Sequence, residues 1–309
     1  MNKFKIVFLT VILAAGVFVF NSCRTNETID PNIDIPGLGG YEYEQTPLDD
    51  WLDQTFLYPY NIKVYYRWDA ALAYTSLSAQ LVPVKVEKVQ PMMDALAKVW
   101  FRPFLYAATP AFLENYAPKT VILVGSPQYT SNGSAVMLGQ AEGASTILLT
   151  NANAFEPSNS TLLRDYLHVI EHEFVHILAQ NAPMPTTFKA VTNQFYDPSG
   201  WQNYSNADAY QRGFMSPYSM TSPDEDFAEI ISLLLVYGLD NFQNNILPVA
   251  AASTINPYAA QALQLKVAIA ADYYLKNFNI NFYDDPNTGK SGLINLVQQA
   301  VEDVVISYQ

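Results

Sequence analysis

The three histidines of this chain all fall in one short segment, HVIEHEFVHIL, which runs from His168 to Leu178. Histidines that only fill space would be scattered along the 309 residues, so their clustering indicates a shared task. Two overlapping spacings are present. Residues 172–176 read as HExxH and residues 168–172 read as HxxEH, and both are typical of helices that bind zinc.

The two spacings compete, because residues one turn apart share a helix face and can converge on one Zn²⁺ at about 2 Å from each nitrogen. His168 and His176 lie about 12 Å apart along the axis, too far for one ion. HExxH makes His172 and His176 ligands and Glu173 the base. HxxEH makes His168 and His172 ligands and Glu171 the base. Apolar neighbours favour HExxH, which leaves His168 outside the ligand set, either next to a ligand or in the cleft wall, with no chemical role.

A zinc ion with an open position for water needs a third protein ligand. No other histidine is present and one cysteine cannot build a thiolate site, so the ligand must be Asp or Glu. The segment DEDFAE offers Glu225 and Glu229, which lie one turn apart on one face. One could bind zinc while the other orients a ligand imidazole. The residues alone leave both assignments open.

The N-terminus has the pattern of a secretory signal. Lys3 and Lys5 precede an apolar run, Ile6–Phe20, and Asn21, Ser22 and Cys23 come next. The run is short for a membrane helix, which needs about 20 residues. We therefore expect a lipoprotein signal peptide over residues 1–22 and a lipid on Cys23, which would anchor the protein to a membrane.

Residues 23–43 are polar and rich in turn-forming residues, and we interpret them as a flexible tether. The folded domain is expected over residues 44–309. The formal charge of −13 makes nucleic acid an unfavourable partner, because an acidic chain repels phosphate. Cys23 is the only cysteine, so the chain can form no intrachain disulfide.

Periodicity and turn signals predict an α+β fold, with a small sheet in an N-terminal lobe and a mostly helical C-terminal lobe. Ser158 or Ser160 is expected to cap the histidine helix, and Ser222 with Pro223 the next one. The predicted elements are a helix over 91–106, strands over 119–125 and 145–150, a turn at 131–134, and helices over 162–180, 222–238, 258–277 and 291–305.

Several motifs together resemble the gluzincin metallopeptidases, and among them the zinc metallopeptidases of bacterial lipoproteins linked to outer-membrane substrate import. The segments are HEFVH, HILAQN, GFMSPYS, EDFAE and PYNIKVYYRWD. The resemblance covers nearly all of residues 48 to 305, and only the zinc-site motifs are specific. It implies a zincin-like fold, one Zn²⁺ per chain, a peptide or protein substrate, and import-system components as partners. It also implies a location on the outer membrane, at the cell surface or the periplasmic face.

A more distant similarity assigns roles. The segment YSMTSPDEDFAE is similar to part of the anthrax lethal factor catalytic domain. That similarity implies that Glu225 is the third ligand, that Glu229 supports a ligand imidazole, and that Tyr218 stabilises the oxyanion or donates a proton.

The expected function is therefore zinc-dependent hydrolysis of a peptide or other amide bond, with Glu173 as the base. An edge strand at 135–142 or 145–150 could hold the substrate backbone. The alternative is a non-catalytic peptide- or glycan-binding lipoprotein that retains its zinc site. A purely structural zinc is disfavoured, because the pattern provides three ligands, a base and an open position.

Overall fold

The computed structural model describes residues 43–73, 81–129, 136–142 and 145–309. The expected signal peptide, nearly all of the expected tether and the turn expected at 131–134 lie outside the described residues. Residues Thr46–Gln309 form one compact unit. Among the described residues, no helix combines the length and the apolar character that crossing a bilayer requires.

A small sheet occupies the N-terminal half of this unit. Its strand order is β1-β2-β6-β5, where β1 is Lys63–Tyr65, β2 is Thr120–Leu123, β5 is Gly139–Glu142 and β6 is Thr146–Leu149. The first three strands are parallel, and β5 runs antiparallel to β6. Strands β3 (Gln128–Tyr129) and β4 (Val136–Met137) form a separate antiparallel pair.

Buried aliphatic runs explain the two central strands. In both β2 (TVIL) and β6 (TILL) the last three residues are buried, as expected where a parallel strand is covered on both faces. The strands predicted over 119–125 and 145–150 are thereby confirmed. Because β6 lies between β2 and β5, only β5 has a free edge on that side of the described sheet.

Helices make up most of the remaining described chain. They are α2 (Pro47–Leu52), α3 (Tyr58–Tyr60), α4 (Ala70–Ala73), α5 (Val86–Leu96), α6 (Arg102–Ala107), α7 (Pro110–Tyr116), α8 (Ser160–Asn181), α9 (Thr186–Val191), α10 (Asn206–Tyr210), α11 (Pro223–Asn241), α12 (Leu247–Ala251), α13 (Ala259–Phe278) and α14 (Leu293–Ser307). Short π-helical turns join α2 to α3, α5 to α6 and α11 to α12. The predicted α+β fold is confirmed.

Two predicted helix starts are wrong. The first helix begins at Val86, and Pro91 lies inside it rather than in its first turn. The carbonyl that Pro91 leaves without an N–H belongs to Glu87, an exposed residue, so water can satisfy it. The cap of α8 is Asn159, whose side chain accepts from the Leu162 amide, and neither predicted serine has this role.

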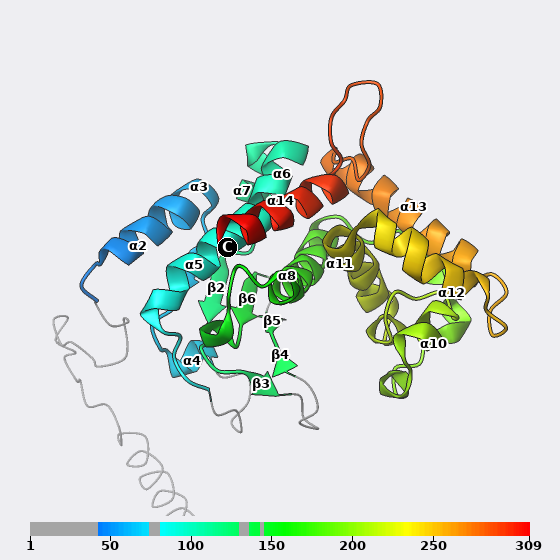
Figure 1. Ribbon diagram of the computed structural model, residues 1–309, viewed down its shortest axis with the longest axis horizontal. Coiled ribbons are helices and arrows are strands. Elements are labelled where there is room, and N and C mark those ends of the chain that lie inside the picture. The colour runs from blue at the N-terminus through cyan, green and yellow to red at the C-terminus, as the bar shows by residue number, and fades with distance from the viewer. Residues whose placement is uncertain (1–42, 74–80, 130–135, 143–144) are drawn as a thin grey trace, which may run out of the picture. The chain divides into compact units, whose positions relative to one another are not determined.

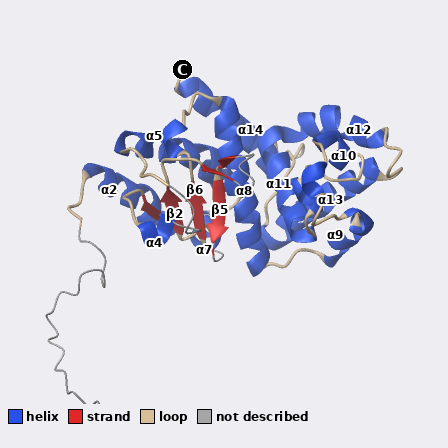
Figure 2. Ribbon diagram, turned by 90° about the horizontal axis from the view of Figure 1, so that it is seen from below, coloured by secondary structure: helices blue, strands red, loops and turns tan. Residues whose placement is uncertain are grey.

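Helix α8 lies between the sheet and α11 (Figures 1 and 2). Its apolar face, with Ile170, Phe174 and Leu178, is fully buried in the main core. The other face carries the histidines towards α11. The helix that holds the candidate ligands is thus fixed on two sides by packing.

The first turn of α11 is anchored in the protein interior. Asp226 forms a fully buried ion pair with Lys266 of α13, with 2.6 Å between Oδ2 and Nζ. Tyr196 donates a hydrogen bond to the same carboxylate oxygen at 2.8 Å. Since a buried carboxylate depends on such partners, this contact fixes the position of the neighbouring Glu225.

Candidate metal centre

The three histidines lie along one face of α8, one turn apart. The ring centroids of His168 and His172 are 6.2 Å apart, and those of His172 and His176 are 4.9 Å apart. His172 is buried, whereas the other two are partly exposed. The shorter separation of the second pair brings those two rings towards a common point.

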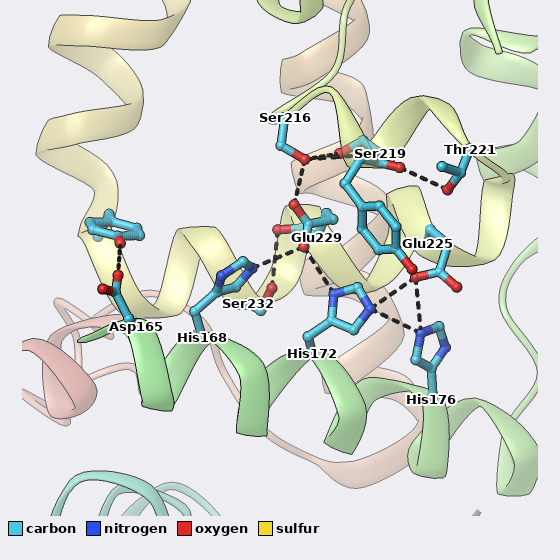
Figure 3. A network of polar contacts seen from close by, with 12 residues as sticks. Asp165, His168, His172, His176, Ser216, Ser219, Thr221, Glu225, Glu229 and Ser232 are labelled. Carbon is cyan, nitrogen blue, oxygen red and sulfur yellow. Dashed lines mark hydrogen bonds and ion pairs between the residues drawn. The ribbon is translucent and has the colours of Figure 1, made fainter. Parts of the chain in front are cut away.

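Helix α11 supplies the acidic residues. Ser222 caps it by accepting a hydrogen bond from the Glu225 amide, and Pro223 occupies the first turn, as predicted. Glu225 and Glu229 both face α8, and Figure 3 shows their carboxylates above the histidine row. Residues far apart in the sequence are thus brought together by the packing of two helices.

The ligand atoms of His172, His176 and Glu225 already form a triangle. The Nε2 atom of His172 is 3.1 Å from Nε2 of His176 and 2.9 Å from Oε2 of Glu225. The remaining side, from His176 Nε2 to Glu225 Oε2, is 3.4 Å. Ligand atoms around a tetrahedral zinc ion stand about 3.3 Å apart when each bond is about 2.0 Å. These three residues therefore fit a zinc ion.

Glu229 contacts the other nitrogen of the central imidazole. Its Oε1 atom lies 3.0 Å from Nδ1 of His172 and 2.9 Å from Nε2 of His168. A proton on Nδ1 of His172 leaves the Nε2 lone pair free for a metal ion. His168, His172 and Glu229 form a second group whose ligand atoms are close enough to hold a metal.

Opposite charges stabilise this arrangement in the metal-free protein. Burial alone would lower the pKa of His172, but hydrogen bonds to Glu225 and Glu229 raise it to about 10. Burial would raise the pKa of Glu225, but hydrogen bonds from His172 and His176 lower it to about 2. An imidazolium thus stands between two carboxylates, and a metal ion would take the place of its Nε2 proton.

The two candidate bases differ in their surroundings. Glu173 lines a cleft of about 500 Å³ together with His176, Glu225, Met184 and other residues. Its charge acts on His172, where it raises the pKa. Two larger hollows, of about 700 and 650 Å³, are lined by no histidine. The cleft with Glu173 therefore adjoins the metal-ligand triangle, since His176 and Glu225 also line it.

Glu171 lies in the core. It is fully buried, and neither carboxylate oxygen has a hydrogen-bond partner among the described residues. Burial raises the pKa of Glu171 well above the usual value, because it disfavours the charged form. Glu171 has no access to the cleft, so the HxxEH interpretation lacks a base in this structure.

Tyr218 lies at the edge of the triangle. It opens a 3₁₀ turn, Tyr218–Met220, just before α11. Its ring packs against His172 and Trp201, with centroid distances of 5.9 Å and 5.2 Å. Burial raises the pKa of Tyr218, and the charge of Glu225 with a hydrogen bond to it raises the pKa further. The phenol thus keeps its proton at neutral pH.

Sequence reasoning missed two contributors to this cluster. His168 was expected either next to a ligand or in the cleft wall, and its contact with Glu229 was not predicted. Ser216 had no expected role, and its hydroxyl donates a hydrogen bond to the same carboxylate. The segment GFMSPYS, which contains Ser216 and Tyr218, was the available signal, because it stood out in the sequence while only its Tyr218 was given a role.

Comparisons with other proteins agree with this chemistry. The family described as "Putative zinc-binding metallo-peptidase" matches residues 41–283. The crystal structure of a protein described in the same words, from Bacteroides caccae, has a TM-score of 0.67 and 23% sequence identity to this chain, and the match covers 85% of this chain and 95% of that one. That likeness shows a shared fold. No curated protein matches the chain.

Proposed function

The chain belongs to this zinc-binding metallopeptidase family, and from that premise we propose that it is a peptidase that hydrolyses peptide bonds at the cleft between α8 and α11. One observation carries the proposal. The Nε2 atoms of His172 and His176 and the Oε2 atom of Glu225 lie 2.9–3.4 Å from one another, and Glu173 lines the adjoining cleft.

In this proposal His172, His176 and Glu225 hold one Zn²⁺. When bound, the ion supplies a Lewis acid that activates water and polarises a carbonyl. Glu229 orients His172 by accepting the Nδ1 proton, which supports the imidazole as a ligand. The low pKa of Glu225, about 2, keeps this ligand ionised at neutral pH.

Glu173 acts as the general base. It removes the proton from the attacking water and then passes it to the amine that leaves. Its position in the cleft with His176 and Glu225 supports this role. A group that only bound a peptide would need no carboxylate at this point, which favours catalysis over simple binding.

Tyr218 donates a hydrogen bond to the oxyanion that develops on the substrate carbonyl. Its raised pKa supports the role, because the phenol must keep its proton to act as a donor. Loss of one such donor typically costs about 3 kcal/mol of transition-state stabilisation.

The deciding experiment incubates the zinc-loaded protein with a diverse peptide library and detects new termini by mass spectrometry. The wild type is expected to cleave, and Glu173→Gln is expected to bind zinc normally without cleaving. A zinc-loaded wild type that cleaves nothing would favour the alternative, a peptide- or glycan-binding protein. Equal cleavage by both proteins would remove Glu173 as the base.

We further propose that a lipid on Cys23 tethers the protein to the outer membrane, where import-system components would be its neighbours. The support is the sequence pattern before Cys23. Cys23→Ala should shift the protein out of the membrane fraction or leave its leader uncleaved. If the variant is processed and sediments with outer membrane like the wild type, the lipid anchor is refuted.

A further inference from the structure

We propose that His168 and Ser216 are positioning residues that act on the metal centre through the buried carboxylate of Glu229. The proposal rests on the metal centre proposed above, and Figure 3 shows the contacts that carry it. His168 holds the carboxylate from α8. Ser216 holds it from the segment that leads to Tyr218. One carboxylate thereby links a ligand imidazole to the turn that bears the oxyanion donor.

The carboxylate of Glu229 has a full set of donors. It is only 3% exposed, so water contributes little to it. Oε1 accepts from Nε2 of His168 at 2.9 Å and from Nδ1 of His172 at 3.0 Å, and Oε2 accepts from the Ser216 hydroxyl. Charge-assisted hydrogen bonds of this kind are strong and directional. Together they fix the plane of the carboxylate.

His168 holds the side of the carboxylate that faces His172, since both imidazoles donate to one oxygen atom. Without His168, Oε1 would have a single donor, and the carboxylate could turn away from His172. The central imidazole would then lose the partner that keeps its proton on Nδ1 and its lone pair on Nε2. The expected result is weaker metal binding, although His168 never touches the ion.

Ser216 couples the same carboxylate to the tyrosine turn. Its hydroxyl donates to Glu229 and accepts from the Ser219 amide at 3.1 Å. The Ser219 hydroxyl is also 3.2 Å away. Tyr218 lies between these two serines in the sequence, so the hydrogen bonds fix the backbone on both sides of it. Ser216 therefore positions the phenol relative to His172.

A second metal ion held by His168, His172 and Glu229 is the competing explanation for this cluster. It is disfavoured, because the ring centroids of His168 and His172 lie 6.2 Å apart, farther than the 4.9 Å between those of His172 and His176. The other oxygen is already bonded to Ser216. His172 would also have to bind two ions through its two nitrogens.

The first test measures zinc affinity and stoichiometry of the full chain by chelator competition, without any substrate. His168→Leu should raise the Kd for zinc about 10–100-fold, the usual cost of losing a partner outside the ligand set. His168→Gln should restore affinity, because its amide offers an N–H in place of Nε2. Two zinc ions per wild-type chain, falling to one in His168→Leu, would overturn the proposal. So would equal affinity in all three proteins.

A second measurement follows the Nδ1 proton of the His172 imidazole. With only three histidines in the chain, ¹⁵N-histidine labelling resolves each ring by NMR. The zinc-loaded wild type should show a protected Nδ1 proton on His172, and His168→Gln should keep it. In His168→Leu that proton should exchange faster. An unchanged exchange rate would show that His168 does not act through Glu229.

Variants of Ser216 distinguish an effect on turnover from an effect on substrate binding. Ser216→Ala should lower kcat and leave KM unchanged, and Ser216→Thr, which keeps the hydroxyl, should recover kcat. Ser216→Ala should also raise the zinc Kd about 10-fold. An unchanged kcat and an unchanged Kd would refute the role of Ser216. If no protein cleaves any peptide, the proposed function fails, while the zinc affinities still decide this inference.

Discussion

Glu171 and Glu173 lie two positions apart on α8 and face opposite environments. Glu171 is fully buried with no hydrogen-bond partner among the described residues, whereas Glu173 lines the cleft beside His176. Two helical positions correspond to a rotation of about 200°, which explains the separation. Only one of the two carboxylates can therefore reach a substrate.

This relationship gives a matched pair of variants. Glu173→Gln should lower kcat about 10²–10⁴-fold, the usual contribution of a general base, with zinc content unchanged. Glu171→Gln should leave kcat close to that of the wild type, because Glu171 is buried away from the cleft and the amide has the same shape. Peptide turnover and metal analysis measure both effects. Loss of activity only in Glu171→Gln would support the HxxEH interpretation instead.

Zinc affinity should rise with pH. The pKa of His172 is about 10 in the metal-free protein, above its ordinary value of 6.5, so the folded chain holds this proton more tightly than the unfolded chain does. Its contribution to stability is complete below pH 6.5 and is lost as the pH approaches 10. Zinc must displace this proton.

The zinc Kd should therefore fall about tenfold per pH unit from about pH 6 to about pH 8. Chelator competition at several pH values measures this, and calorimetry in buffers of different ionisation enthalpy counts the released protons. A Kd that is independent of pH over this range would show that His172 is already neutral before zinc binds.

Glu225 and Glu229 should differ in how much zinc binding depends on them. Glu225→Gln should abolish tight binding, because a neutral amide replaces an ionised ligand. Glu229→Gln should weaken binding about 10–100-fold, since only the support of His172 is altered. Dialysis followed by metal analysis distinguishes the two. The reverse order would make Glu229 the ligand.

Tyr218→Phe should leave zinc content unchanged and lower kcat about 10²–10³-fold, the range for loss of an oxyanion donor. The ring packing against His172 and Trp201 is retained in phenylalanine, so the fold should tolerate the change. Steady-state kinetics with a cleaved peptide measures the effect. Wild-type kcat in this variant would remove Tyr218 from the mechanism.

Local signals in the sequence predicted the parts of the fold that local interactions determine. Ser222 and Pro223 mark the start of α11 because capping involves only neighbouring residues. Strand β1 was missed, because three residues, Lys63–Tyr65, are too short to show a period. Its partner in the sheet, β2, comes much later in the sequence, and pairing between distant segments gives no signal in the local sequence.

The metal centre likewise has one part that local sequence predicts and another part that it does not. His172, Glu173 and His176 lie on one helix, so their spacing in the sequence was enough to predict that they lie close together. The choice between Glu225 and Glu229 depends on how α11 is rotated against α8, and only the resemblance to known enzymes addressed it. The contacts of Ser216 and His168 with Glu229 depend on the same rotation of α11 against α8. Local sequence patterns do not predict this rotation.

The triangle of His172, His176 and Glu225 joins two helices that a long stretch of chain separates. A bound ion would close that stretch into a loop, as a disulfide closes a loop between two cysteines. Such cross-links stabilise mainly by restricting the unfolded chain, and the effect grows slowly with loop length. Because Cys23 is its sole cysteine, the chain cannot form an intrachain disulfide that would restrict the unfolded state in the same way. Loss of the metal would remove this cross-link, so resistance to heat and to proteolysis should fall when zinc is scarce.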